Sequence, residues 1–414
     1  MTGYPHSPNT TKPSAGQKRP VSSSALFSAL LLRLGRPIAQ LYYDAVKRRH
    51  PVRHKVTLLS RQSANLSLDF RLLIAELRER DPELEIAVHS LRDEGGMRGL
   101  KAIISSLSSE LRDVASSQAV ILDGYNPAIS YFDQRPELYV LQIWHALGAI
   151  KRFSMQSLDT TGGRSSALAR AARMHHGYSQ ILCGGAGSIQ VFAEAFGVAP
   201  ECIVTALLPR VDELRTLRSQ PGAADQLLYT PTFRDSPQAR AQWCNAALEL
   251  ADAADVAGLN LTIILHPLSF VQMQRDGLAD ELAALTPYLE TGRSTQELLP
   301  DCAHLITDYS AVAFEAALAG RNVWFYDYDL DEYLAGRGLN IDTALELPEA
   351  TYQTAPQLIE ALRDAAPDSK VSEASQAFFS RYLAQEEGSA TTRVADMVLS
   401  NCDSACITDH GAQV

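Results

Sequence analysis

The feature that most constrains the fold of this chain is an alternation of short β-branched runs with longer helical patterns, which occurs twice along the sequence. Strands that alternate with helices are typical of a parallel sheet covered by helices. Since 414 residues are also too many for one ordinary core, we predict an α/β fold of two doubly wound domains. The expected strands are 55–60, 85–88, 119–123, 139–143, 180–183 and 203–208 in the first half, and 226–230, 261–265, 304–307 and 322–326 in the second.

Changes in composition divide the chain into segments. The first residues are rich in Ser, Pro, Thr and Gly and lack apolar periodicity, as disordered tails do. Pro221-Gly222 lies in a weakly patterned stretch that we interpret as a linker between the two domains. The expected division is a disordered tail at 1–24, a basic amphipathic segment at 25–54, an N-terminal domain at 55–217, a C-terminal domain at 225–403 and a tail at 404–414.

The segment at 25–54 combines an apolar helical pattern with basic residues. Leu26 and Leu30 belong to a run at helical spacing, which ends in the basic triplet 47–49. One interpretation is an interfacial helix on an anionic membrane surface, where each basic side chain adds about 1 kcal/mol of attraction. The alternative is a helix that docks on the folded body. The basic residues that flank the apolar run favour the membrane-surface interpretation.

Charge and cysteine usage narrow the class of protein further. Basic residues are concentrated in the first 60 positions while the whole chain carries a net charge of −11, which argues against a nucleic-acid partner. The six cysteines are scattered without zinc-site spacing, no signal peptide opens the chain, and no apolar run is long enough to span a bilayer. The acidic run 327–332 fits no metal-ligand template. We expect a cytoplasmic protein without a metal site.

Two histidines directly follow predicted strands, one in each half. His145 comes after the strand 139–143, and His266 comes after the strand 261–265 and before Pro267. Ligands bind at the carboxyl ends of the strands in open α/β sheets, so both imidazoles should face a cleft between the domains. We predict that His145 is a general base and that His266 stabilises a phosphate leaving group. A structural role for either histidine is the alternative.

The stretch HLITDYSAVAFEAALAG is the most informative of the second half, since it predicts a buried strand, a polar turn and a helix over 311–319. Free backbone N–H groups at such a helix start can bind a diphosphate. The alternative is helix capping without a ligand. Glu315, one turn further, could reach a ribose hydroxyl or be a solvated helix residue. The predicted donor-binding residues of this stretch are Thr307, Asp308, Tyr309, Ser310, Ala311 and Glu315.

A further polar segment, YTPTFRD, follows the first strand of the second half. It adds Thr232 and Arg234 to the predicted substrate-binding residues, because a guanidinium can hold a phosphate through two parallel hydrogen bonds. A surface Arg234 paired with Asp235 is the alternative interpretation.

Five separated motifs, QIWHALGAIKRF, LLYTPTFRD, ILHP, LITDYSAVAFE and WFYDYDLDEY, occur in an order that resembles the CDP-glycerol glycerophosphotransferase family of teichoic-acid polymerases and primases. The resemblance covers roughly residues 115–345. It implies a GT-B type fold, in which two Rossmann-like domains face a central cleft and the second domain binds the donor. His145 and His266 map onto the family's two essential histidines. The chain departs from the family at 146–148, where Ala-Leu-Gly replaces the common Gly-Thr-Pro.

The resemblance also implies the reaction and its partners. An acceptor hydroxyl would attack the β-phosphorus of CDP-glycerol and release CMP, without a metal or other cofactor. The acceptor would be a lipid-linked, teichoic-acid-type molecule at the cytoplasmic face of the membrane, so we expect a peripheral membrane enzyme. Three alternatives remain at this point: a donor such as CDP-ribitol, sugar transfer by a GT-B glycosyltransferase, and a nucleotide-binding scaffold without catalytic activity.

Overall fold

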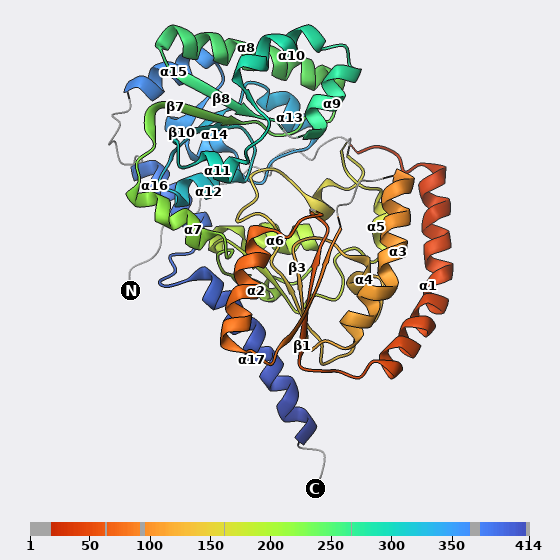
Figure 1. The fold of residues 1–414 in the computed structure, drawn as a ribbon. Helices are drawn as coiled ribbons and strands as arrows, with labels where there is room; N and C mark the ends of the chain where they lie inside the picture. Colours follow the sequence, from red (N-terminus) through yellow and green to blue (C-terminus); the bar gives the residue numbers. More distant parts are fainter. Residues whose placement is uncertain are drawn as a thin grey trace, which may run out of the picture.

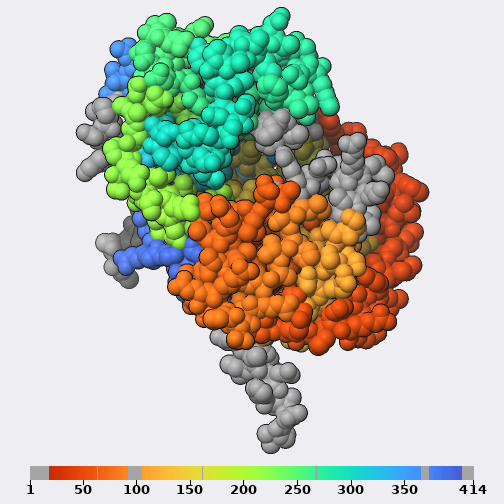
Figure 2. Space-filling model, in the orientation of Figure 1, coloured from red at the N-terminus to blue at the C-terminus, as the bar shows by residue number. Residues whose placement is uncertain are grey.

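The computed structural model describes residues 18–62, 64–91, 96–160, 162–265, 267–364 and 373–410. They form two lobes, each built on a parallel sheet with helices packed against it (Figure 1). Figure 2 shows the second half of the chain, in green and teal, above the first half, in orange and red, with a hollowed surface where the lobes meet. The predicted α/β architecture of two sheets is therefore present.

The first lobe holds a six-stranded parallel sheet of order β2-β1-β3-β4-β5-β6. Side chains alternate between its two faces, so Leu58 and Leu141 share a core with α2, whereas Leu59 and Val140 pack with α1 and α3 on the other face. Both faces are thus covered. The strands are β1 (Lys55–Ser60), β2 (Glu85–Ser90), β3 (Ala119–Leu122), β4 (Tyr139–Gln142), β5 (Gln180–Cys183) and β6 (Ile203–Thr205). The helices are α2 (Leu68–Arg80), α3 (Gly96–Ala115), α4 (Pro127–Ser130), α5 (Ser166–Ala171), α6 (Ile189–Phe196) and α7 (Val211–Thr216).

The second lobe repeats this plan with the order β12-β11-β10-β7-β8-β9, again all parallel. The two edge strands, β9 and β12, have two residues each and were not predicted from the sequence. The strands are β7 (Ala223–Thr230), β8 (Asn260–Ile264), β9 (Leu289–Glu290), β10 (Cys302–Thr307), β11 (Asn322–Tyr326) and β12 (Thr351–Tyr352). The helices are α8 (Pro237–Ala257), α9 (Pro267–Arg275), α10 (Ala279–Leu285), α11 (Thr295–Leu298), α12 (Val312–Leu318), α13 (Leu330–Gly336), α14 (Thr343–Glu346), α15 (Ala355–Asp364) and α16 (Glu373–Tyr382).

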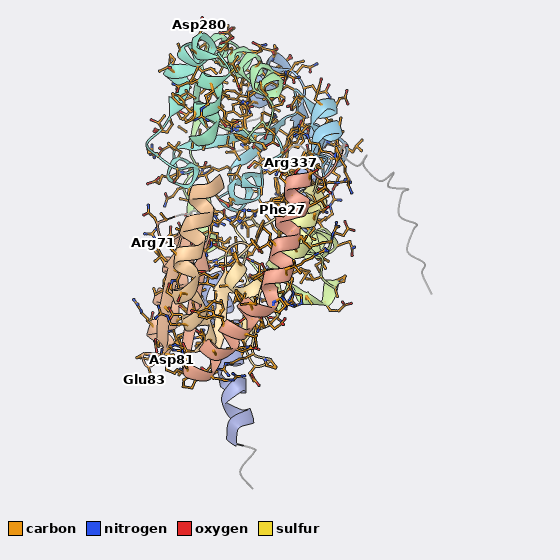
Figure 3. The ribbon with its side chains drawn as sticks, turned by 90° about the vertical axis from the view of Figure 1, so that its right-hand side faces the viewer. Phe27, Arg71, Asp81, Glu83, Asp280 and Arg337 are labelled. Carbon is orange, nitrogen blue, oxygen red and sulfur yellow. The ribbon has the colours of Figure 1, made fainter. Side chains whose placement is uncertain are left out.

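The N-terminal segment is one helix, α1 (Ser23–Arg49), which continues through Pro37 and runs along the outer surface of the first lobe (Figure 3). It packs against α3 and α5 and buries Ala29, Tyr43 and Val46. The opposite side exposes a row of large apolar side chains. These are Leu26, Phe27, Leu30, Leu31, Leu34, Ile38, Leu41 and Tyr42. The helix therefore docks on the body, as one of the two interpretations expected, and also presents an apolar face. Among the described helices, none combines the length and apolar character that a membrane span requires.

The C-terminal helix α17 (Ala390–His410) crosses back to the first lobe (Figure 1). Its first turn is held by the Asp212 carboxylate, which accepts hydrogen bonds from the backbone N–H groups of Ala390 and Thr391. Further along, the helix contacts α2 and strands β3 and β4. The sequence-based division assigned 225–403 to one domain and 404–414 to a tail. The described helix instead packs on the first lobe and continues to His410.

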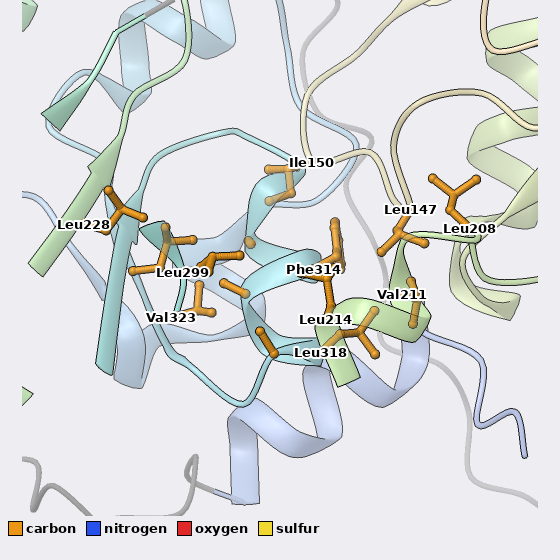
Figure 4. Packing of buried hydrophobic residues seen from close by; sticks show 14 of the residues in the cluster. Leu147, Ile150, Leu208, Val211, Leu214, Leu228, Leu299, Phe314, Leu318 and Val323 are labelled. Atoms are coloured by element: carbon orange, nitrogen blue, oxygen red, sulfur yellow. The ribbon is translucent and has the colours of Figure 1, made fainter. Parts of the chain in front are cut away.

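The two lobes also meet through the loop that follows β4. The carbonyl of Ile150 accepts hydrogen bonds from the backbone N–H groups of Asn340 (2.7 Å) and Ile341 (3.1 Å). Gly148 lies so close to α12 that an added Cβ would stand 2.5 Å from the ring of Phe314. Figure 4 shows Ile150, Phe314 and their apolar neighbours packed together in this region. The loop that carries His145 is thus placed directly against the second lobe.

Candidate active site

His145 lies in the loop after β4, and a strained neighbour fixes its position. Trp144 adopts a φ of 60°, a left-handed conformation that costs a non-glycine residue of order 1 kcal/mol or more. Its indole packs against Phe153 and Phe196, and its backbone N–H donates to the Gln142 side chain at 3.0 Å. Such strain persists where the surroundings impose it. The fold therefore holds the backbone just before His145 in one conformation.

The hydrogen bonds of His145 define which ring nitrogen is available for chemistry. Nδ1 lies 3.1 Å from the backbone carbonyl of Asp123, which can accept but not donate, so Nδ1 carries the proton. Nε2 then holds the lone pair. Although the residue keeps access to solvent, partial burial of the ring lowers the pKa of His145 to about 4, with a smaller contribution from the positive charges of Arg210 and Lys151. His145 is therefore a neutral base near pH 7.

A cluster of charged residues that sequence analysis missed surrounds His145. Arg210, between β6 and α7, donates to the His145 carbonyl at 2.8 Å and pairs with Asp69 at 3.2 Å. It also lies 3.4 Å from Glu315 on α12, so it joins the two lobes. Burial raises the pKa of Asp123 to about 6 and also raises that of Asp69. Arg210 and Asp123 could have been found, since both lie at or just after predicted strand ends.

Glu315 contacts protein groups in this structure. One carboxylate oxygen lies beside Arg210, and the other accepts a hydrogen bond from Gln296 at 3.2 Å. The side chain is 7% exposed. The two sequence interpretations were a ribose ligand and a solvated helix residue; the structure contradicts the second, because Glu315 is buried at the junction of the lobes.

The turn after β10 brings most of the other predicted residues together, but several support the backbone. The hydroxyl of Thr307 donates to the Thr230 carbonyl at 2.7 Å. The buried Asp308 accepts the N–H groups of Thr232 (2.8 Å) and Tyr309 (2.6 Å). Ser310 remains half-buried, as does Ala311, which caps α12. The helix begins at Val312 and ends at Leu318, inside the predicted range of 311–319.

Arg234 differs from both sequence interpretations. It is 4% exposed, and its guanidinium donates to both Asp329 oxygens at 2.7 and 3.0 Å, to Asp308 at 2.9 Å and to the Thr232 carbonyl at 2.7 Å. Buried charges require such pairing. Arg234 is therefore neither an open phosphate clamp nor a surface partner of Asp235. It fixes the position of Asp308 and, through it, the turn after β10.

Tyr309 completes the same buried network. Its hydroxyl donates to Asp329 at 3.0 Å, and its ring stacks on Tyr333 with 3.9 Å between centroids. Burial, together with the surrounding carboxylates, raises the pKa of Tyr309 well above its usual range. The predicted donor-binding role of this side chain is thus not visible in its contacts, which are internal.

A cavity of about 670 Å³ opens beside this turn, at the carboxyl ends of β7, β8 and β9. Its size is within the range of small-molecule sites, and its position is where open α/β sheets bind ligands. Thr230 lines it, and the buried Thr230 hydroxyl oxygen has no hydrogen-bond partner among the described residues. Further lining residues are Ile264, Phe270, Glu290, Arg293, Ser310 and Val312.

His266 lies outside the described residues, between the end of β8 at Ile264 and the start of α9 at Pro267. Its predicted role stays a prediction. Among the side chains that are described, no three from His, Cys, Asp and Glu are grouped so that they could hold a metal ion.

Solved structures with the same architecture define the class of fold. The wall teichoic acid polymerase TagF matches 92% of this chain and 99% of its own, with a TM-score of 0.64 and 17% identity. The two lobes with facing parallel sheets are a GT-B type fold, as expected from the motifs.

The sequence then places the chain within that class. The profile of the CDP-glycerol:poly(glycerophosphate) glycerophosphotransferase family matches residues 42–400, so the chain belongs to this family. A teichoic acid ribitol-phosphate primase of Bacillus spizizenii is 28% identical over 89% of this chain and 97% of its own length. A teichoic acid glycerol-phosphate primase of the same organism is 25% identical over 76% of this chain and 82% of its own.

Proposed function

We propose that the protein transfers glycerol phosphate, or a related polyol phosphate, from a CDP-linked donor to a hydroxyl of a lipid-linked, teichoic-acid-type acceptor. The main supporting observation is that His145 lies on a loop of one lobe that packs against the other lobe, and that a cavity opens at the strand ends of this second lobe. Family membership supports the same reaction. In this proposal the lobe built from 55–217 receives the acceptor, and the lobe within 225–403 binds the donor.

The chemistry assigned to His145 follows from its tautomer. Nε2 removes the proton of the acceptor hydroxyl while the hydroxyl oxygen forms a bond to the β-phosphorus of the donor. The bond between that phosphorus and the bridging oxygen breaks, and CMP leaves with the bonding electrons. The residues around the cavity position the donor, a task that dominates catalysis of phosphoryl transfer. His266 is proposed to stabilise the leaving phosphate.

The test is CMP release from CDP-glycerol in the presence of a membrane-lipid acceptor. We expect release with CDP-glycerol and no sugar transfer from nucleotide sugars. Absence of turnover with every donor, despite nucleotide binding, would favour a scaffold instead. CDP-ribitol belongs in the same experiment, because a ribitol-phosphate primase aligns over nearly its full length. Faster release from CDP-ribitol would assign the polyol without changing the mechanism.

We also propose that the exposed apolar face of α1 lies on an anionic membrane surface. Arg33, Arg48 and Arg49 are exposed on the same helix, so apolar insertion and electrostatic attraction can act together. Deleting residues 1–50 would remove Tyr43 and Val46 from the core as well, so substitutions are the sharper test.

Replacing Leu34 and Ile38 with serine should weaken binding to vesicles of mixed neutral and anionic lipid by at least about tenfold, since each buried side chain contributes roughly 1.5–3 kcal/mol. Vesicle sedimentation measures the loss. Serine at Val256 and Leu345, which are also exposed but lie in the second lobe, is the matched control. Equal binding of both double variants would contradict a role for α1.

A further inference from the structure

Lys151 comes from the first lobe but is fixed against the second. Its backbone forms an antiparallel bridge with Leu339, and its carbonyl accepts a hydrogen bond from the Asn340 side chain at 3.1 Å. The flanking Arg152 donates its backbone N–H to the Gly338 carbonyl at 3.1 Å. The side chain is half-buried between the lobes. A lysine is thus held at the junction, six residues after His145.

Lys151 is surrounded by charges but makes no ion pair or side-chain hydrogen bond to a described residue. Burial lowers the pKa of Lys151 to about 8. The positive charges of Arg337 and Arg234 contribute to this lowering, whereas the Asp308 and Asp235 carboxylates oppose it. An ammonium group in this setting lacks the compensating charge that buried cations normally have.

The neighbouring arginines have such partners already. Arg234 is held by Asp308 and Asp329, and Arg337 lies 3.5 Å from Asp235. Arg210 pairs with Asp69 and Glu315. Among these four cations, Lys151 is therefore the one without a direct counter-charge from a described residue.

The turn after β10 connects Lys151 with the cavity. Ser310 of the turn after β10 lines the cavity, while Asp308 of the same turn interacts electrostatically with Lys151. A nucleotide whose base and sugar occupy the cavity would have its phosphates at this turn. We propose that Lys151, which belongs to the first lobe, binds the diphosphate of a donor held by the second lobe. Lys151 would then be a substrate-binding residue that the sequence analysis did not predict. The inference rests on the proposed function.

A bound diphosphate favours the charged form of the lysine and raises its pKa. Binding near pH 8 should therefore take up a fraction of a proton. Besides the four charged groups named above, His145 faces the same ammonium from its own loop. His145 is neutral at this pH, so the uptake reports on Lys151.

The test is calorimetric titration of the full-length protein with CDP and with cytidine. Lys151→Met should weaken CDP binding roughly 10- to 100-fold, the range expected for one charge-assisted hydrogen bond, and leave cytidine binding unchanged. Lys151→Arg should restore part of the affinity. Proton uptake at pH 8, measured in buffers of different ionisation enthalpy, should disappear in Lys151→Met. Lys47→Met, on the last turn of α1, is the matched control.

The possible outcomes separate the proposed role of Lys151 from the proposed function. Native protein that binds CDP while Lys151→Met binds it equally well overturns the role of Lys151 and leaves the proposed function standing. Parallel loss of CDP and cytidine binding overturns it too, because the residue would then support the structure. Native protein that binds neither compound overturns the proposed function itself.

Discussion

Replacing His145 with glutamine should lower CMP release by about 10²- to 10⁴-fold, the contribution of a positioned general base. Glutamine keeps a donor for the Asp123 carbonyl but has no basic nitrogen, so the fold and nucleotide binding should be preserved. The measurement is kcat with saturating CDP-glycerol and lipid acceptor. His50→Gln, at the C-terminal cap of α1, controls for the loss of a histidine elsewhere and should leave kcat unchanged.

The pH dependence gives an independent check on His145. The catalytic form is neutral, and burial lowers the pKa of His145 to about 4. Activity that depends on this base should therefore persist as the pH falls through 6.5, the ordinary pKa of histidine, and decline only near pH 4–5. A decline centred near 6.5 in kcat would contradict the lowered pKa, and activity retained in the glutamine variant would contradict the role.

The second large effect concerns the stability of the buried network around Arg234. Replacing Asp329 with alanine removes two hydrogen bonds to Arg234 and one to Tyr309. It leaves a buried guanidinium with one carboxylate, Asp308, and breaking a buried pair typically costs about 3–5 kcal/mol. We expect a loss of this size in the free energy of unfolding, measured by urea titration of the transition that reports on the second lobe.

Asp331→Ala is the matched control for this experiment, because Asp331 is an exposed carboxylate in the first turn of the same helix, α13. Its replacement should change the free energy of unfolding by less than about 1 kcal/mol. Similar losses in the two variants would mean that the Arg234 network adds no stability beyond that of a surface charge.

Most strands of the two sheets could be predicted from the sequence, because a buried parallel strand is a short local run of β-branched and apolar residues. Residues 55–60 and 119–122 are examples. The sequence did not predict β9 and β12, since two residues carry no pattern. It also missed the return of α17 to the first lobe. That packing depends on Asp212, which lies 178 positions from the helix start that it caps.

The location of the site could be predicted from the sequence, but the roles of its individual side chains were harder to predict. Strand-end reasoning located His145 and the turn after β10, yet it could not distinguish a side chain open to a ligand from one that is used internally. Arg234 illustrates the difficulty, because its partner Asp329 is 95 residues away. The same limit explains why Lys151 was not selected, since its importance arises from the second lobe packed against it.

The backbone bridge between 150–152 and 338–341 has a mechanical consequence. The loop that carries the base starts from the first sheet, but three successive residues of it are bonded to the second lobe. If the lobes separate while these bonds hold, residues 150–152 must move with the second lobe, whereas His145 stays bonded to the Asp123 carbonyl of the first lobe. The chain must then bend between His145 and Ile150. Opening would therefore move the base away from the donor pocket and leave its distance from the acceptor surface unchanged.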